Sequence, residues 1–190
     1  MVKSRKGRPG KRYNSSFSIQ KVGLRWWLCD QMPASSVLDV YGGYGLMWRQ
    51  VWERRATTYT AIDGDALKWL EFHNLDYDIY DVDPWGSPWE ALDRINQKST
   101  KDKIGIVCTD GAVKRQGQIR GLMPKIIVEK LAWDTKDKRL LAEVFYHYPA
   151  ACRQILRAVM PSHKIIALAV KEHGGCGCGT AYFAAILQKL

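Results

Sequence analysis

Short apolar runs alternate along the chain with longer stretches in which apolar residues recur every three or four positions. The short runs are rich in β-branched residues and are typical of buried strands. They predict strands at residues 35–41, 57–63, 78–82, 103–109, 164–172 and 180–188. The longer stretches are typical of helices with one apolar face. They predict helices at residues 18–31, 46–55, 65–72, 88–95 and over most of 114–160, with breaks at 134–137 and 147–149.

The order of these elements predicts the fold class. Strands alternate with helices up to residue 160, which requires a mostly parallel sheet with right-handed crossovers. The last two strands flank a Gly-rich loop and predict a C-terminal hairpin that adds an antiparallel strand. We therefore expect an α/β, Rossmann-like fold. Ligands of such sheets bind at the carboxyl ends of the strands, near the point where the strand order reverses.

Charge is distributed unevenly along the 190 residues, which have a net charge of +10. Residues 1–29 hold eight basic residues and no acidic one, and the rest of the chain is close to neutral. We expect a flexible basic arm at residues 1–16 and one globular domain at residues 17–190. A polyanion is the natural partner of such an arm, and a solvated tail is the alternative. The basic residues of its first twelve positions are the candidate nucleic-acid contacts: Lys3, Arg5, Lys6, Arg8, Lys11 and Arg12.

Several classes of protein are excluded by composition. Apolar residues make up 46% of the chain and charged residues 25%, as in ordinary globular proteins, so a wholly disordered, collagen-like or coiled-coil chain is excluded. No run of 18 apolar residues suggests a membrane span, and five irregularly spaced cysteines predict a cytoplasmic protein without a disulfide framework. His173, Cys176 and Cys178 supply three of the four ligands that zinc requires, so we expect a hairpin loop there and no metal.

The first candidate ligand site is the turn VLDVYGGYG, in which Asp39 near a strand end precedes several glycines. Glycine permits positive φ and close approach of a ligand to the backbone. The turn lacks the G-x-G-x-x-G pattern of a nicotinamide site, and an acid there suits a cationic or zwitterionic ligand. The turn resembles the first motif of class I S-adenosylmethionine (SAM) methyltransferases. That resemblance implies SAM as cofactor, held by Asp39, Gly43 and Gly45, with Tyr41 where the first glycine usually stands.

Two further acids are candidates for the cofactor site. Asp63 ends the second predicted strand 18 residues after Gly45, close to the spacing of a ribose-binding acid. Asp65 lies in GDALKWL, which resembles the third methyltransferase motif, whose Asp contacts adenine; the alternative is that Asp65 caps the following helix. Residues 55–78 are too few for both strand–helix units usual in that family, so we expect one unit to be missing or merged. Both acids therefore remain candidates.

The stretch DIYDVDPWGSPW indicates a site for an amine. Asp83 follows a buried strand, and its carboxylate can accept a hydrogen bond from an exocyclic amine. Pro84 has no N–H, its carbonyl can accept a second bond, and Trp85 can stack on a base. Together these groups would orient a nitrogen lone pair toward an electrophilic methyl group, and such positioning supplies much of the rate of a bimolecular transfer.

The segment DPWGSP (83–88) resembles the D-P-[F/Y]-G-[S/T]-P motif of the tRNA guanine-N2 dimethyltransferases, and CTDGAV (108–113) resembles that family's T-D-x-A turn. The resemblance can be followed over roughly residues 35–188. It implies a SAM-dependent methyltransferase that modifies an exocyclic amine of a nucleic-acid base, with RNA favoured over DNA and Asp83, Pro84 and Trp85 as catalytic residues.

Two other hypotheses stay open. The first is a methyltransferase of a protein or small-molecule amine, and the second is a nucleic-acid-binding module on a degenerate methyltransferase fold. The target base, the number of methyl groups and the oligomeric state are also open. Trp89 lies beside the DPWGSP motif and is a candidate pocket residue, whereas we expect Trp26, Trp27, Trp48, Trp52 and Cys108 to lie in the core.

Overall fold

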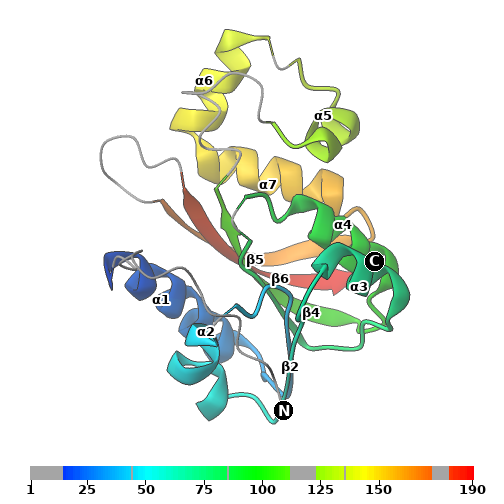
Figure 1. The fold of residues 1–190 in the computed structure, drawn as a ribbon. Coiled ribbons are helices and arrows are strands. Elements are labelled where there is room, and N and C mark those ends of the chain that lie inside the picture. Colours follow the sequence, from blue (N-terminus) through cyan, green and yellow to red (C-terminus); the bar gives the residue numbers. More distant parts are fainter. Residues whose placement is uncertain (1–14, 44, 85, 112–122, 135, 173–179) are drawn as a thin grey trace.

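The computed structural model describes residues 15–43, 45–84, 86–111, 123–134, 136–172 and 180–190 (Figure 1). The strands are β1 (Ser36–Asp39), β2 (Thr58–Ala61), β3 (Ile79–Val82), β4 (Lys103–Asp110), β5 (His163–Glu172) and β6 (Ala181–Lys189). The helices are α1 (Ser15–Gln31), α2 (Leu46–Gln50), α3 (Ala66–Phe72), α4 (Trp89–Lys98), α5 (Lys125–Leu131), α6 (Lys138–Tyr146) and α7 (Tyr148–Val159), with a short 3₁₀ helix, η1 (Trp52–Arg54).

These strands form one mixed sheet in the order β2-β1-β3-β4-β6-β5. The first four strands in that order run parallel, and β6 pairs antiparallel with both β4 and β5. The predicted α/β fold with its C-terminal hairpin is therefore confirmed. Between residues 55 and 78 the chain forms a single strand–helix unit, β2 and α3, as expected from the shortness of that segment.

Helices cover both faces of the sheet, with α1 and α2 on one side and α4 and α7 on the other (Figure 1). The alternation of side chains along each strand produces the two cores. Val37, Ile79 and Val107 are buried on the side of α1, whereas their neighbours Leu38 and Ile106 are buried on the side of α4 and α7. Apolar residues on both faces explain why these strands appear as continuous apolar runs in the sequence.

Two predicted helices differ clearly in extent from those observed. Helix α1 begins at Ser15, three residues before its predicted start, and the helix predicted over 46–55 is divided into α2 and η1. The predicted breaks in the region 114–160 are confirmed: α6 begins after Asp137, whose carboxylate caps it, and α7 follows His147. Residues 114–122, predicted as helix, lie outside the described residues. No helix among the described segments is long and apolar enough to cross a membrane.

The direction of α1 matters for the site. Its C-terminal half packs on the amino-terminal part of β4, where a Cβ on Gly105 would lie 2.8 Å from the sulfur of Met32 and 3.0 Å from Leu28. Its N-terminal half lies at the other edge, where Lys21 contacts Asp83 directly after β3. The chain that precedes α1 therefore joins the domain on the side of the carboxyl edge of the parallel strands.

Candidate active site

Acidic residues stand at the carboxyl ends of all four parallel strands. Asp39 ends β1, Asp63 follows β2 by two residues, Asp83 follows β3 directly, and Asp110 ends β4. Asp39 is in register with Ala61 of β2 and with Asp81 of β3, so these strand ends are neighbours. The structure thus brings the predicted acids together along one edge of the sheet, which is the edge where ligands of parallel sheets bind.

The turn after β1 depends on its glycines. Gly43 and Gly45 have φ angles of +51° and +67°, a left-handed conformation that favours glycine, and Gly45 stands at the N-terminus of α2. A Cβ on Gly42 would lie only 2.7 Å from the Cβ of Ala61, so this turn packs directly against the end of β2. Gly42 was not among the predicted site residues, although the Gly-Gly pair in the sequence signals such a close approach.

Asp39 is buried, with 3% of its surface exposed. One carboxylate oxygen accepts a hydrogen bond of 2.6 Å from the Tyr59 hydroxyl, and the other accepts one of 3.3 Å from the backbone N–H of Tyr41. Burial and the neighbouring charge of Asp81 raise the pKa of Asp39 from 3.8 to about 7, although the Tyr59 hydrogen bond opposes the rise. A positive ligand charge beside this carboxylate would favour its ionised form.

Asp63 and Asp65 lie after β2 and are both exposed. The carboxylate of Asp65 accepts a hydrogen bond of 3.1 Å from the backbone N–H of Lys68, so Asp65 is the N-cap of α3, as its alternative interpretation predicted. Within the described part of the chain, no hydrogen bond or ion pair occupies the carboxylate of Asp63. Of the two acids, Asp63 is the one whose oxygens are all available to a ligand.

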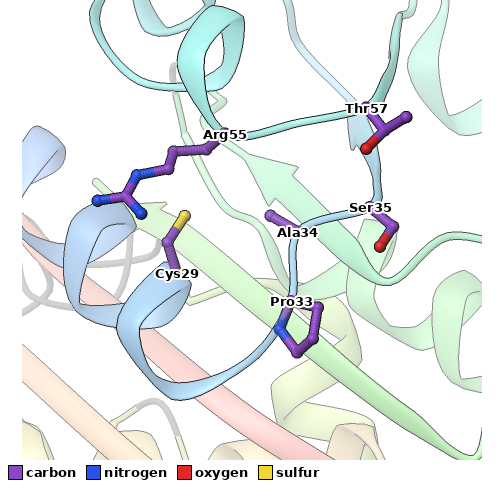
Figure 2. A pocket seen from close by; sticks show the side chains of 6 residues that line it. All are labelled: Cys29, Pro33, Ala34, Ser35, Arg55 and Thr57. Atoms are coloured by element: carbon purple, nitrogen blue, oxygen red, sulfur yellow. The ribbon is translucent and has the colours of Figure 1, made fainter.

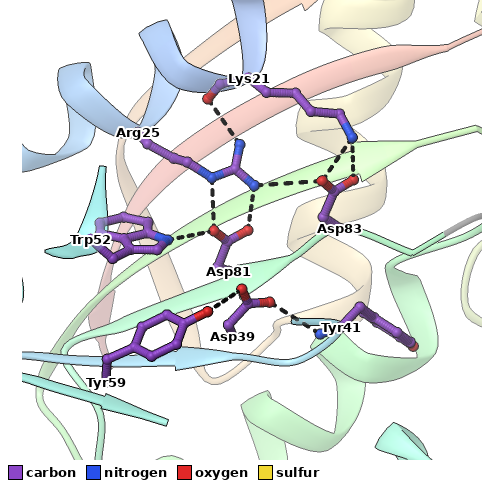
Figure 3. Close-up of polar contacts among 8 residues, drawn as sticks. All are labelled: Lys21, Arg25, Asp39, Tyr41, Trp52, Tyr59, Asp81 and Asp83. Atoms are coloured by element: carbon purple, nitrogen blue, oxygen red, sulfur yellow. Dashed lines mark hydrogen bonds and ion pairs between the residues drawn. The ribbon is translucent and has the colours of Figure 1, made fainter. Parts of the chain in front are cut away.

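Asp83 is held by two basic residues of α1 (Figure 3). The ammonium nitrogen of Lys21 lies 2.7 Å from each carboxylate oxygen, and Nη2 of Arg25 lies 3.8 Å from Oδ2. Burial alone would raise the pKa of Asp83, but the charges of Arg25 and Lys21 outweigh it and hold the pKa below its ordinary value of 3.8. The carboxylate is therefore ionised at neutral pH, which makes it a good hydrogen-bond acceptor and a weak base.

Beneath Asp83 lies a buried ion pair that sequence reasoning missed. Arg25 is 1% exposed and Asp81 is fully buried. Nε and Nη2 of Arg25 donate to the two carboxylate oxygens of Asp81, the first at 2.7 Å, and the indole N–H of Trp52 donates to the same carboxylate at 2.7 Å (Figure 3). Two spacings in the sequence are compatible with this cluster. Lys21 and Arg25 are four residues apart and share one face of a helix, and Asp81 and Asp83 are two residues apart and share one face of a strand.

The two motifs after β3 and β4 are joined by a backbone hydrogen bond of 2.8 Å from the N–H of Gly111 to the carbonyl of Gly86. Asp110, at the end of β4, is buried and accepts hydrogen bonds of 2.9 Å from the indole of Trp89 and the hydroxyl of Tyr148. Trp89 is fully buried and stacks on Phe183. The expectation that Trp89 lines the pocket is therefore wrong, because its indole anchors α4 to β4.

Other tryptophans and cysteines lie largely where expected. Trp52 and Cys108 are buried in the core, whereas Trp26, Trp27 and Trp48 are half-buried and pack against it. Burial raises the pKa of the Cys108 thiol well above its ordinary value.

A shallow pocket lies away from these acids, at the amino ends of β1 and β2 (Figure 2). It has a volume of about 290 Å³, and its lining residues include Cys29, Ser35 and Arg55. Because it lies at the opposite edge of the sheet, it is not part of the candidate active site. Among the residues whose structure is described, no group of His, Cys, Asp and Glu side chains could hold a metal ion.

Some predicted site residues cannot be placed. Trp85, the loop residues His173, Cys176 and Cys178, and the basic residues of positions 1–12 lie outside the described residues. Pro84 follows Asp83 as the motif requires, and Tyr41 is half-buried in the turn after β1.

The fold is similar to that of solved methyltransferases. Trm1 from Pyrococcus horikoshii, solved with S-adenosyl-L-methionine, has a TM-score of 0.58 at 16% identity; the match covers 93% of this chain and 56% of Trm1. The N-methyltransferase NodS from Bradyrhizobium japonicum WM9, solved with S-adenosyl-L-homocysteine, has a TM-score of 0.53 at 10% identity, covering 91% of this chain and 87% of NodS.

A third similar structure is yhhF from Escherichia coli, a candidate methyltransferase, with a TM-score of 0.52 at 13% identity and coverage of 95% of this chain and 89% of yhhF. No protein-family model matches the sequence, and no curated protein matches it. The chain thus has the fold of these methyltransferases, and it spans just over half the length of Trm1.

Proposed function

We propose that this protein is a SAM-dependent methyltransferase that modifies an exocyclic amine of a nucleic-acid base, with guanine N2 in RNA as the favoured target. The observation that carries the proposal is Asp83. This ionised carboxylate follows β3 directly, precedes Pro84, and lies one strand from the glycine turn after β1. In a fold shared with methyltransferases, we interpret Asp83 as the acceptor for an amine and the neighbouring glycine turn as the cofactor site.

The residues after β1 and β2 fit SAM. The cofactor carries positive charge on its sulfonium and its amino group, and Asp39 is a buried carboxylate that such charge would keep ionised. Gly43 and Gly45 give the turn the open backbone that a bound ligand can approach. Asp63, whose carboxylate is available, is our choice for the ribose hydroxyls, and Asp65 retains one uncommitted oxygen for the adenine amino group. When bound, SAM supplies the electrophilic methyl group.

Asp83 and Pro84 would act by positioning. The Asp83 carboxylate accepts a hydrogen bond from the target amine, and the Pro84 carbonyl accepts a second one. These bonds fix the direction of the nitrogen lone pair, which is the main requirement of a bimolecular transfer. A carboxylate whose pKa is held below 3.8 is a poor proton acceptor, which suits a reaction in which the amine becomes acidic only after it has attacked. We keep Trp85 as the base-stacking residue on its place in the motif.

Nucleic acid as the substrate is supported by charge and topology. The basic residues of positions 1–12 precede α1, and the N-terminal half of α1 lies at the edge of the sheet that carries Asp83. The helix that follows this basic segment therefore begins on the side of the sheet that carries the amine site. A protein or small-molecule amine gives this segment no role.

The direct test is methyl transfer from labelled SAM to a panel of tRNA, rRNA, duplex DNA and single-stranded DNA, with the Asp83→Ala variant as control. We expect transfer to an RNA by the wild type and none by the variant. Transfer to a protein extract but to no nucleic acid would replace the proposed substrate class. Absence of SAM binding in calorimetry would leave a binding module on this fold as the better explanation.

A further inference from the structure

Lys21 occupies the carboxylate that the proposed reaction needs. Its ammonium nitrogen lies 2.7 Å from both oxygens of Asp83, so it holds the positions at which a target amine would donate its hydrogen bond (Figure 3). A carboxylate offers about four lone-pair positions, and the ammonium of Lys21 uses one on each oxygen. An amine that enters the site has to share Asp83 with Lys21 or replace it.

The two cations beside Asp83 are held very differently. Arg25 is 1% exposed and is bound to Asp81 through two nitrogens and to the carbonyl of Lys21 through a third. The side chain of Lys21 is 22% exposed, and the hydrogen bonds described for its ammonium go to Asp83 alone. The ammonium also lies 5.7 Å from the centre of the Tyr182 ring. Lys21 is therefore the cation that can leave Asp83, whereas Arg25 stays in place beside it.

A displaced ammonium needs another anion. Part-buried ion pairs are costly to break when one charge is left alone, so Lys21 would leave Asp83 readily only if a second acceptor came with the substrate. A target nucleotide brings such an acceptor, because each nucleotide in a strand carries a phosphate on its sugar. A free base or a neutral amine brings none.

We propose that Lys21 is a specificity-determining residue that exchanges Asp83 for a phosphate of the target strand. The oxygens of Asp83 are then released only to an amine that arrives on a nucleic acid. This inference rests on the proposed function and adds to it a rule for choosing between nucleic-acid and other amines. It makes Lys21 part of the substrate site, although α1 contains neither a glycine turn nor a motif acid.

The test compares Lys21→Met with a matched control, Lys101→Met. Lys101 also pairs with an acid of the β3 region, 3.4 Å from Asp78, but it lies at the amino edge of the sheet. Binding of a tRNA transcript is measured in S-adenosylhomocysteine at several salt concentrations. Since each phosphate contact contributes roughly 0.7–0.9 to the log–log salt slope, Lys21→Met should flatten the slope by about that amount. Lys101→Met should leave the slope unchanged, and Lys21→Arg should restore it.

A second readout separates substrate choice from folding. Lys21→Met should lower kcat/KM on tRNA far more than it lowers methylation of the free nucleoside guanosine, so the preference for RNA drops by about tenfold or more. An unchanged salt slope and an unchanged preference would overturn the role of Lys21 while leaving the proposed function intact. If the wild type itself neither binds nor methylates any nucleic acid, the proposed function fails and this inference fails with it.

Discussion

Replacing Asp39 by Asn should make the free protein more stable at neutral and higher pH. In the folded protein the pKa of Asp39 is raised to about 7, chiefly by burial, whereas the ordinary value of an exposed Asp is 3.8. Between those two pH values the folded state keeps a proton that the unfolded chain has lost. Wild-type stability therefore falls as pH rises through this range, and the fall ends near pH 7.

The size of the effect follows from proton linkage. One group that is protonated only in the folded state lowers the free energy of unfolding by about 1.4 kcal/mol for each pH unit, so the loss between pH 5 and pH 7 is about 2–3 kcal/mol. Asn fills the same space, can still accept the Tyr59 hydrogen bond, and carries no charge next to Asp81. For a chain of this length, the Tm of Asp39→Asn should exceed that of the wild type by roughly 5–10 °C more at pH 8 than at pH 5.

Thermal unfolding of the two proteins without cofactor, followed at pH 5 and pH 8, measures this difference. Asp63→Asn is the matched control, because it removes an exposed carboxylate from the neighbouring strand end. It should change Tm by no more than about a degree at either pH. If wild type and Asp39→Asn lose stability in parallel between the two pH values, Asp39 does not bind its proton in the folded state. The same variant should bind SAM more weakly, since the proposed cofactor charge loses its counter-charge.

Three further predictions concern the site. Asp83→Ala should lower methyl transfer by on the order of 10²-fold or more with SAM affinity within a few-fold of wild type, and Asp83→Asn should retain partial activity; full activity in the Ala variant would exclude the amine site. Asp63→Ala should weaken SAM binding in calorimetry by about tenfold, because one hydrogen-bonded ribose contact is lost, and Asp65→Ala should weaken it less. If Asp63→Ala binds SAM as tightly as the wild type does, the cofactor lies elsewhere. Deleting residues 1–12 removes six positive charges and should flatten the salt slope of RNA binding by roughly 3 if half of them contact phosphates, whereas an unchanged slope would mean a solvated tail.

Much of the fold follows from local patterns in the sequence. The apolar runs locate the strands because a strand buried on both faces needs apolar side chains at successive positions. The strand–helix alternation requires parallel pairing, and parallel pairing places every strand's carboxyl end at one edge. The sequence alone therefore predicts that Asp39, Asp63 and Asp83 lie at a common edge. Residue spacing also indicated the single strand–helix unit between residues 55 and 78, since chain length limits what can fit.

Which partner each charged side chain has was decided by tertiary structure. The i,i+4 spacing of Lys21 and Arg25 indicates a basic helix face, but it does not say that Lys21 contacts Asp83, 62 residues away. That contact depends on the direction in which α1 crosses the sheet. The same packing pairs Arg25 with Asp81 and brings Trp89 to Asp110. Sequence periodicity predicts which face of an element is buried, but it does not predict which other element packs against that face. The charge environment of Asp83, and hence its proposed chemistry, depends on contacts between elements that are distant in the chain.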